Sequence, residues 1–451
     1  MGWMEEMGKR RMTGDSVRCL VGLLLAVALT GCGEVPDSVP SAAEGEDRME
    51  PAPGQPVYQG AVEVDPESGH LAGRWTVRFL VEPPQDRMVT FLLNRGIELE
   101  ELSGVAMDSL TVEPMEGIDW FQQVTVYLAD GLSHGSVVEL RFAYEGEPVM
   151  SPGGINRVDS DWVELGADAA WHPLFFPLTQ QLRGEVELGL PPGWSVVTSG
   201  SVSPGPDGHH LRNSLPQVDI AFSAAPAMDS AATAQFTVHH TGAHADRVEH
   251  LLDVGSWAVD YLNERFGTQA PLPEARLVLA PRAGPSYSRR NYLVFAADAD
   301  LPGERELLRH YCHEFAHFWS TGADPLSPEN WLNESFAELV GAHCVRDRLG
   351  EVAYDSVVRG WREEAEGQPP VWTPEASGRP STEVAYRKGP YLLHRLEERM
   401  GRGDFHRFLE RHLVAEGRAT SEMLSLLEEV GGPEVRSWFE MALAREELDE
   451  L

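Results

Sequence analysis

A five-residue motif, His313-Glu314-Phe315-Ala316-His317, constrains this chain more than any other stretch. On a helix, residues four apart share one face, so His313 and His317 can direct two imidazoles at one point. Zinc takes nitrogen, sulfur or oxygen ligands in a tetrahedron, and a catalytic zinc site leaves one position for water. Glu314 lies beside that position, where it can take a proton from water and pass it to a leaving group. The motif therefore predicts a catalytic centre with one Zn²⁺ ion.

The flanking residues support this interpretation over a chance match of two unrelated histidines. Residues 307–319 form an amphipathic pattern, with apolar side chains on a 4-3-4 spacing that is typical of a helix. A second helical pattern begins near Trp331 and carries Glu334 in its first turn. We therefore expect Glu334 to be the third metal ligand, which completes a His₂Glu set.

Glu338 follows Glu334 by one helical turn. Its carboxylate could accept a hydrogen bond from the far nitrogen of a zinc-bound histidine and so fix the tautomer of that ring. The alternative is a surface carboxylate with no part in the site.

Two cysteines, Cys312 and Cys344, lie on the two helices that carry the predicted zinc ligands. They could pair in an oxidising compartment. A disulfide needs its two Cα atoms close together, and nothing in the sequence fixes that distance. The sequence alone therefore favours two buried free thiols over a disulfide.

Charge excludes one class of function. The 451-residue chain has a formal net charge of −35, so its field opposes binding to nucleic acid. An acidic surface favours solubility and weakly favours cationic substrates, and solvation is the simpler explanation. The sequence gives no indication of the oligomeric state.

The N-terminal region resembles an export signal. In residues 1–31, a basic stretch precedes a short apolar run, and the run ends in Leu29-Thr30-Gly31-Cys32, which is similar to a bacterial lipobox. The resemblance implies cleavage before Cys32 and lipid attachment to its thiol, whereas an ordinary secretory signal is the alternative. Residues 32–56 are rich in proline and acidic residues and are expected to form a flexible tether.

The anchor predicts a location in the cell envelope. A lipid on Cys32 would hold the chain on a membrane, and Gly33, rather than Asp, follows it. By resemblance to lipoproteins of bacteria with two membranes, this favours the outer membrane.

The rest of the chain divides into two parts. Residues 57–225 alternate apolar and polar side chains with period two and predict an antiparallel β domain. Residues 226–451 carry the zinc motif and are mostly helical in pattern. Three histidines near the start of this part, His239, His240 and His244, could form a second metal site, but a solvated loop is the preferred interpretation.

Four motifs together resemble the zinc aminopeptidases of the membrane-alanyl aminopeptidase type, which include the leukotriene hydrolases. They are the H-E-x-x-H motif, the segment Trp331-Leu332-Asn333-Glu334-x-Phe336-Ala337, the segment Tyr386-Arg387-Lys388-Gly389, and Phe266-Gly267 followed by Pro271-Leu272-Pro273. The resemblance implies an N-terminal β domain, a thermolysin-like catalytic domain and peptide substrates. It also implies that Tyr386 donates a hydrogen bond to the developing oxyanion.

One departure from that family concerns substrate recognition. The family carries a G-x-M-E-N strand before the zinc motif, and its glutamate binds the free amine of the substrate. The corresponding segment here is Tyr287-Ser288-Arg289-Arg290-Asn291, which places Arg290 where the glutamate should be. A cation repels an ammonium group, so an endopeptidase or a peptidase for N-blocked substrates is an alternative to an aminopeptidase. Asn291 is a candidate for binding the substrate backbone.

A second alternative belongs to a different class of protein. A surface lipoprotein could keep the peptidase fold and bind peptides without cleaving them. The presence of all five catalytic and metal-binding candidates argues against this alternative.

Overall fold

A computed structural model describes residues 49–448 apart from the short gaps at 82–86, 117, 151–154, 179, 207, 269, 285, 298–301, 321, 326 and 416. The predicted signal peptide, Cys32 and the first part of the tether lie outside the described residues. None of the helices in the part of the chain that is described combines the length and the apolar character needed to cross a bilayer.

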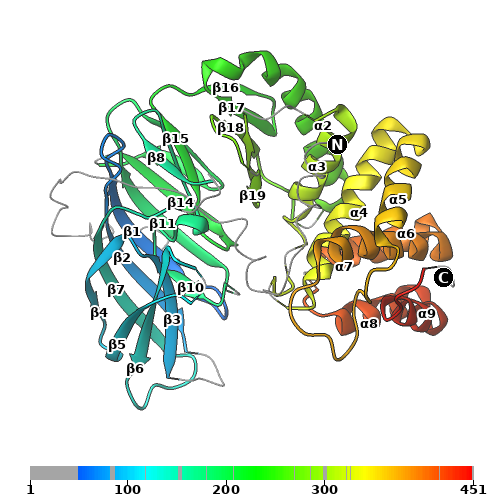
Figure 1. The fold of residues 1–451 in the computed structure, drawn as a ribbon, viewed down its shortest axis with the longest axis horizontal. Coiled ribbons are helices and arrows are strands. Elements are labelled where there is room, and N and C mark those ends of the chain that lie inside the picture. Colours follow the sequence, from blue (N-terminus) through cyan, green and yellow to red (C-terminus); the bar gives the residue numbers. More distant parts are fainter. Residues whose placement is uncertain are drawn as a thin grey trace. The chain divides into compact units, whose positions relative to one another are not determined.

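The chain divides into two compact units. The first comprises residues up to Ala227 together with Pro281–Pro285, and the second comprises Met228–Ala280 and Ser286–Leu451. Strands dominate the first unit, and a small sheet with many helices forms the second (Figure 1). The fold class is the predicted one, a β domain followed by a mostly helical domain.

Three sheets form the first unit, with strand orders β13-β14-β11-β1-β2-β7-β4, β10-β3-β6-β5 and β12-β15-β9-β8. The strands are β1 (Val57–Val64), β2 (Leu71–Leu80), β3 (Met88–Asn94), β4 (Ile97–Ser103), β5 (Met107–Pro114), β6 (Phe121–Leu128), β7 (Val137–Gly146), β8 (Arg157–Asp159), β9 (Trp162–Leu165), β10 (Leu174–Phe176), β11 (Leu182–Gly189), β12 (Ser195–Thr198), β13 (Ser201–Pro204), β14 (His209–Gln217) and β15 (Phe222–Ala225).

Apolar side chains that alternate with polar ones along the strands form the core of this unit. Val138, Leu140, Phe142 and Tyr144 alternate along β7 and are all buried, which is the burial that their spacing predicts. The sheets are antiparallel with one exception, because β1 and β11 pair in parallel. Parallel pairing joins strands far apart in sequence, so local periodicity could not predict it.

A five-stranded mixed sheet opens the second unit, in the order β16-β17-β18-β20-β19. Its strands are β16 (Asp229–Ala232), β17 (Phe236–His240), β18 (Ala275–Ala280), β19 (Tyr287–Arg289) and β20 (Tyr292–Ala296). The α-helices are α2 (Val248–Phe266), α3 (Glu304–Ala316), α4 (Asn330–Leu349), α5 (Glu351–Ala365), α6 (Gly389–Met400), α7 (Arg402–Val414), α8 (Thr420–Gly431) and α9 (Pro433–Leu443).

The histidines near the start of this unit do not form the expected solvated loop. His239 and His240 belong to β17, which pairs with β18, and the side chain of His244 lies outside the described part. Burial lowers the pKa of His239 to about 4. Neither described histidine belongs to a group able to hold a metal ion.

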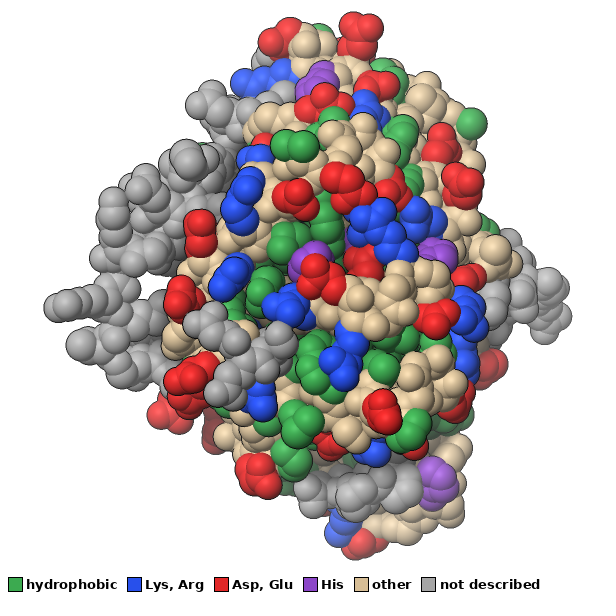
Figure 2. Space-filling view, turned by 90° about the vertical axis from the view of Figure 1, so that its right-hand side faces the viewer, with side chains coloured by type: hydrophobic (Ala, Val, Ile, Leu, Met, Phe, Trp, Pro, Cys, Tyr) green, Lys and Arg blue, Asp and Glu red, His purple; other side chains and the backbone are tan. Residues whose placement is uncertain are grey.

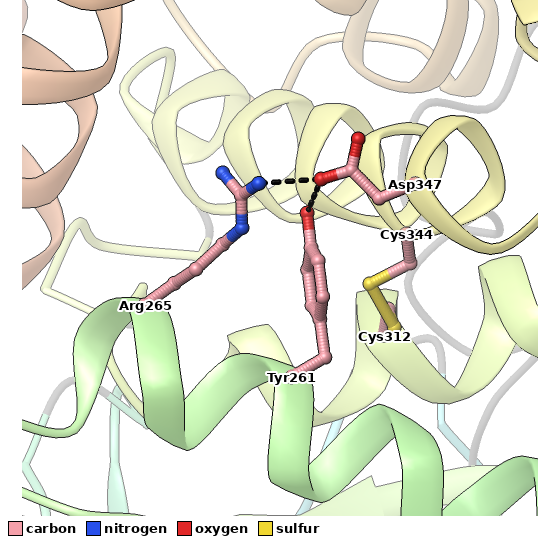
Figure 3. The surroundings of a disulfide bond; sticks show 5 residues. All are labelled: Tyr261, Arg265, Cys312, Cys344 and Asp347. Atoms are coloured by element: carbon pink, nitrogen blue, oxygen red, sulfur yellow. Dashed lines mark hydrogen bonds and ion pairs between the residues drawn. A yellow bond between two sulfur atoms is a disulfide. The ribbon is translucent and has the colours of Figure 1, made fainter. Parts of the chain in front are cut away.

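A disulfide joins Cys312 on α3 to Cys344 on α4, and this corrects the expectation of two free thiols (Figure 3). The two helices pack with the Cα atoms of these residues 6.5 Å apart, which is within the range that a disulfide spans. The same side of α4 also binds α2. Figure 3 shows that Asp347 accepts a hydrogen bond from Tyr261 and forms an ion pair with Arg265.

The surface charge is mixed on the face that Figure 2 draws. Acidic and basic side chains are interspersed there among neutral ones, and no single-sign patch dominates that view. This is the distribution expected of charge that serves solvation.

Candidate zinc centre

Two helices of the second unit bring the three predicted metal ligands together. His313 lies in the last turn of α3, His317 caps the same helix, and Glu334 lies near the start of α4. Their ligand atoms all lie within 4.8 Å of one another. The Nε2 atoms of His313 and His317 are 3.7 and 3.5 Å from Oε2 of Glu334.

Two observations show that this group fits a metal ion. Oε2 of Glu334 is buried and has no hydrogen-bond partner, which is costly unless a cation binds it. Burial alone would lower the pKa of His313, but Glu334 and Glu338 outweigh it and raise that pKa to about 10. The site therefore favours an added positive charge, and two imidazoles with a carboxylate suit zinc.

A shell of acceptors orients the two imidazoles. Nδ1 of His313 lies 3.1 Å from Oε2 of Glu338, and Nδ1 of His317 lies 3.1 Å from the carbonyl oxygen of Ser320. When each Nδ1 donates its proton to that acceptor, Nε2 is left free to bind a metal. The structure thus places Glu338 beside a ligand rather than on the surface, since its side chain is only 4% exposed.

Glu338 is held as an anion. Burial would raise its pKa, but Arg309, His313 and Arg387 outweigh the burial and hold the pKa at about 2. Trp361 donates a further hydrogen bond to its Oε1 at 3.2 Å. A fixed negative charge at this place strengthens His313 as a ligand.

Glu314 has the properties of a general base. Burial raises its pKa, but the nearby His310, His313 and His317 lower it below the usual value, so the carboxylate is ionised at neutral pH. Ser288, on the edge strand β19, donates a hydrogen bond to its Oε2 at 2.6 Å. Nδ1 of His310 lies 3.7 Å from the other oxygen.

Tyr386 lies against the same centre. It belongs to a π-helical turn, η4 (Val384–Lys388), and its ring stacks on His313 with centroids 5.5 Å apart. Burial and the charge of Glu334 raise its pKa well above the usual value, so the phenol keeps its proton. A protonated phenol beside a metal site can donate to an oxyanion.

The two candidate substrate residues have different surroundings. Arg290 forms the tight connection between β19 and β20 with φ of +56°, and its guanidinium donates to the carbonyl oxygen of Phe318 at 2.7 Å. Asn291 is only 2% exposed, and its amide donates to the carbonyl oxygen of Glu274 at 2.6 Å. Through this hydrogen bond Asn291, just before β20, is linked to the residue just before β18, and its contact with substrate stays a prediction.

We compared the chain with protein-family models and with solved structures. No protein-family model matches the chain. Among solved structures, the M1 zinc metallopeptidase of Deinococcus radiodurans superimposes with a TM-score of 0.65 at 17% sequence identity, covering 87% of this chain and 94% of that chain. A mutant two-domain M1 zinc metallopeptidase bound to L-arginine gives a TM-score of 0.67 at 18% identity, with coverage of 87% and 93%.

This chain has the fold of the two-domain M1 zinc metallopeptidases. Leukotriene A4 hydrolase from Saccharomyces cerevisiae is also similar, with a TM-score of 0.66 at 14% identity over 86% of this chain and 67% of that chain. The M1 structures cover 87% of this chain, which extends over both units, so the M1 fold accounts for the β unit as well as for the unit with the candidate metal ligands.

Sequence reasoning missed three side chains at this centre. They are Ser288 and His310, which face Glu314, and Arg379, whose Nη2 lies 3.6 Å from Oε1 of Glu334. His310 precedes Glu314 by one helical turn, so the helical period alone could have found it. Ser288 and Arg379 reach the site from a strand and a loop, for which the sequence offers no such signal.

Proposed function

We propose that this protein is a zinc-dependent peptidase that hydrolyses peptide bonds. The observation that carries the proposal is the buried group of His313, His317 and Glu334, with an ionised Glu314 and a protonated Tyr386 beside it. A structurally similar mutant enzyme from Deinococcus radiodurans is bound to a Tyr-Ser-Ala substrate, which supports peptides as the substrate class.

The side chains divide the chemistry among them. A bound zinc ion supplies Lewis acidity, which lowers the pKa of water and polarises a carbonyl group. Glu314 accepts the proton of the attacking water and returns it to the leaving amine. Tyr386 donates a hydrogen bond to the oxygen on which negative charge develops. Glu338 keeps His313 in the tautomer that binds metal.

Specificity for a substrate's N-terminus depends on which side chains face its terminal amine. An aminopeptidase needs a group that binds a free amine, and the described hairpin formed by β19 and β20 contains no acidic residue. Arg290 lies in this hairpin, two residues after Ser288, which contacts the general base. This favours, as a second candidate, a peptidase that cleaves inside chains or accepts blocked N-termini. Asp298 and Asp300 lie outside the described residues.

A peptide library distinguishes these possibilities. The zinc-loaded chain is incubated with peptides of which half are N-acetylated, and mass spectrometry identifies the cut sites. Glu314→Gln should abolish cleavage, whereas Glu383→Gln, at an exposed carboxylate before η4, is the matched control. Loss of single residues from free peptides alone indicates an aminopeptidase, and cuts in acetylated peptides indicate the second candidate. Cleavage that does not depend on Glu314 contradicts the proposed mechanism.

We also propose that a lipid on Cys32 anchors the protein to a membrane of the cell envelope, with the outer membrane favoured. The lipobox-like sequence supports this, and so does the disulfide, because disulfides persist mainly outside the reducing cytosol. Cells fed a labelled fatty acid should incorporate it into this protein. Cys32→Ser should release the protein from the membrane fraction, and an unlabelled parent protein would contradict the anchor.

A further inference from the structure

Lys388 has an unusual environment for a lysine. Its side chain is completely buried, and it is the one lysine among the described residues. Nζ donates to four backbone carbonyl oxygens, which are those of Gln368 at 2.6 Å, Pro369 at 3.0 Å, Arg445 at 2.8 Å and Glu446 at 2.8 Å. Burial lowers its pKa to about 8, so the side chain still carries its charge at neutral pH.

The four carbonyl oxygens come from two segments far apart in sequence. Gln368 and Pro369 follow α5, and Arg445 and Glu446 follow α9. These segments also meet directly, because the backbone amides of Val371 and Trp372 donate to the carbonyl oxygen of Leu443 at 2.9 and 3.2 Å. The ammonium group therefore ties the C-terminal segment and the segment after α5 to the end of η4.

The same turn is fixed on its other side by α4. Ser335, next to the ligand Glu334, donates to the carbonyl oxygen of Ala385 at 2.6 Å. Gly389 packs so closely that an added Cβ would lie 1.9 Å from Oγ of Ser335. Tyr386 is thus held between an attachment to α4 before it and the Lys388 attachment after it.

From this geometry we propose that Lys388 is a positioning residue for Tyr386, and that the C-terminal segment at Arg445 and Glu446 is part of the support of the active site. The inference rests on the proposed function, in which the Tyr386 phenol stabilises the oxyanion. A misplacement of about 1 Å at such a group can lower a rate about 100-fold. Because η4 is attached at both ends, the Tyr386 phenol is kept in the position that the reaction needs. Lys388 itself touches no reacting group.

A double-mutant cycle tests the proposal on the zinc-loaded full chain. Lys388→Met should lower kcat at least about tenfold, with KM and bound zinc unchanged, and Tyr386→Phe should lower kcat about 100-fold or more. In the Tyr386→Phe background, Lys388→Met should cause no further loss of kcat. Equal losses in both backgrounds would overturn the proposal, as would a parent-like kcat for Lys388→Met.

Two further variants distinguish a positioning effect on Tyr386 from a general loss of stability. Removal of Arg445–Leu451 takes away two of the four acceptors without changing the sequence of η4. This truncation should lower kcat when Tyr386 is present and cause no further loss in the Tyr386→Phe background. Arg282→Met removes a buried charge that pairs with Glu164 in the first unit, and any loss of kcat that it causes should be equal in both Tyr386 backgrounds. A loss of kcat on truncation that is equal in both Tyr386 backgrounds would overturn the proposal.

A spectroscopic measurement separates this proposal from the proposed function. If the parent chain cleaves no peptide, the proposed function fails, and the position of Tyr386 can still be followed by ¹⁹F NMR of a fluorotyrosine at this site. Lys388→Met should shift or broaden that resonance, whereas Arg282→Met should not. An unchanged resonance in Lys388→Met would overturn the positioning role.

Discussion

Oγ of Ser288 donates a hydrogen bond to Oε2 of Glu314 at 2.6 Å, although the two residues are 26 positions apart in the sequence. The donor stands on the edge strand of the mixed sheet, and the acceptor stands on α3. With His310 on its other side, the carboxylate that we propose as general base is oriented by both the sheet and its own helix.

We expect Ser288→Ala to lower kcat about tenfold or more, because a hydrogen bond to a charged group contributes about 1.5–3 kcal/mol. KM and the zinc content should stay close to those of the parent. Ser288→Thr keeps the hydroxyl and should retain most of the activity, and Ser425→Ala, at an exposed serine on α8, is the control. A parent-like kcat for Ser288→Ala would show that the hydrogen bond has no part in orienting Glu314.

The contact between Glu338 and His313 predicts a change in metal affinity. Glu338→Gln removes the negative charge beside the ligand, and loss of such a partner typically weakens metal binding about 10- to 100-fold. Competition with a chromogenic chelator measures the zinc affinity. Glu364→Gln is a matched control, since it removes a half-exposed carboxylate that also pairs with Arg387. Equal zinc affinities for both variants would contradict the role of Glu338.

The proximity of His313 and His317 could be predicted from sequence because helical periodicity places both side chains on one face of a helix. The mostly helical character of the second unit follows for the same reason, since helical patterns are local. Ser288 and the Cys312–Cys344 bridge depend on where a strand or a second helix packs, and no local pattern encodes those distances. The burial of Asn291 depends likewise on the neighbouring strand β18, whose preceding residue, Glu274, accepts its hydrogen bond.

The disulfide predicts a measurable loss of stability on its removal. Cys312 and Cys344 are 32 positions apart, and a loop of that length contributes about 3–4 kcal/mol through the entropy of the unfolded chain. Cys312→Ala with Cys344→Ala should therefore lower the urea midpoint of the zinc-loaded protein. The parent protein treated with a reductant should shift in the same direction. Identical midpoints for oxidised parent, reduced parent and double variant would show that the bridge does not stabilise the fold.

His412 predicts how stability changes with pH. This residue of α7 is buried against Phe336 on α4 and Phe408 on α7, and burial lowers its pKa to about 4, below an unfolded value of about 6.5. Between these values the unfolded chain binds the proton and the folded chain does not. Stability from this residue is therefore full above about pH 6.5 and is lost as the pH falls toward 4.

Between pH 7.5 and pH 5 this loss amounts to about 2 kcal/mol of unfolding free energy from His412 alone. Urea denaturation of the parent and of His412→Leu at both pH values measures it, because titration elsewhere, including at the zinc centre, is common to both proteins and cancels. The variant should lose less stability than the parent on acidification, whatever its stability at pH 7.5. His250→Leu, at an exposed histidine on α2, controls for removal of an imidazole from the surface. An equal loss in the parent and in His412→Leu would contradict a buried neutral imidazole at this position.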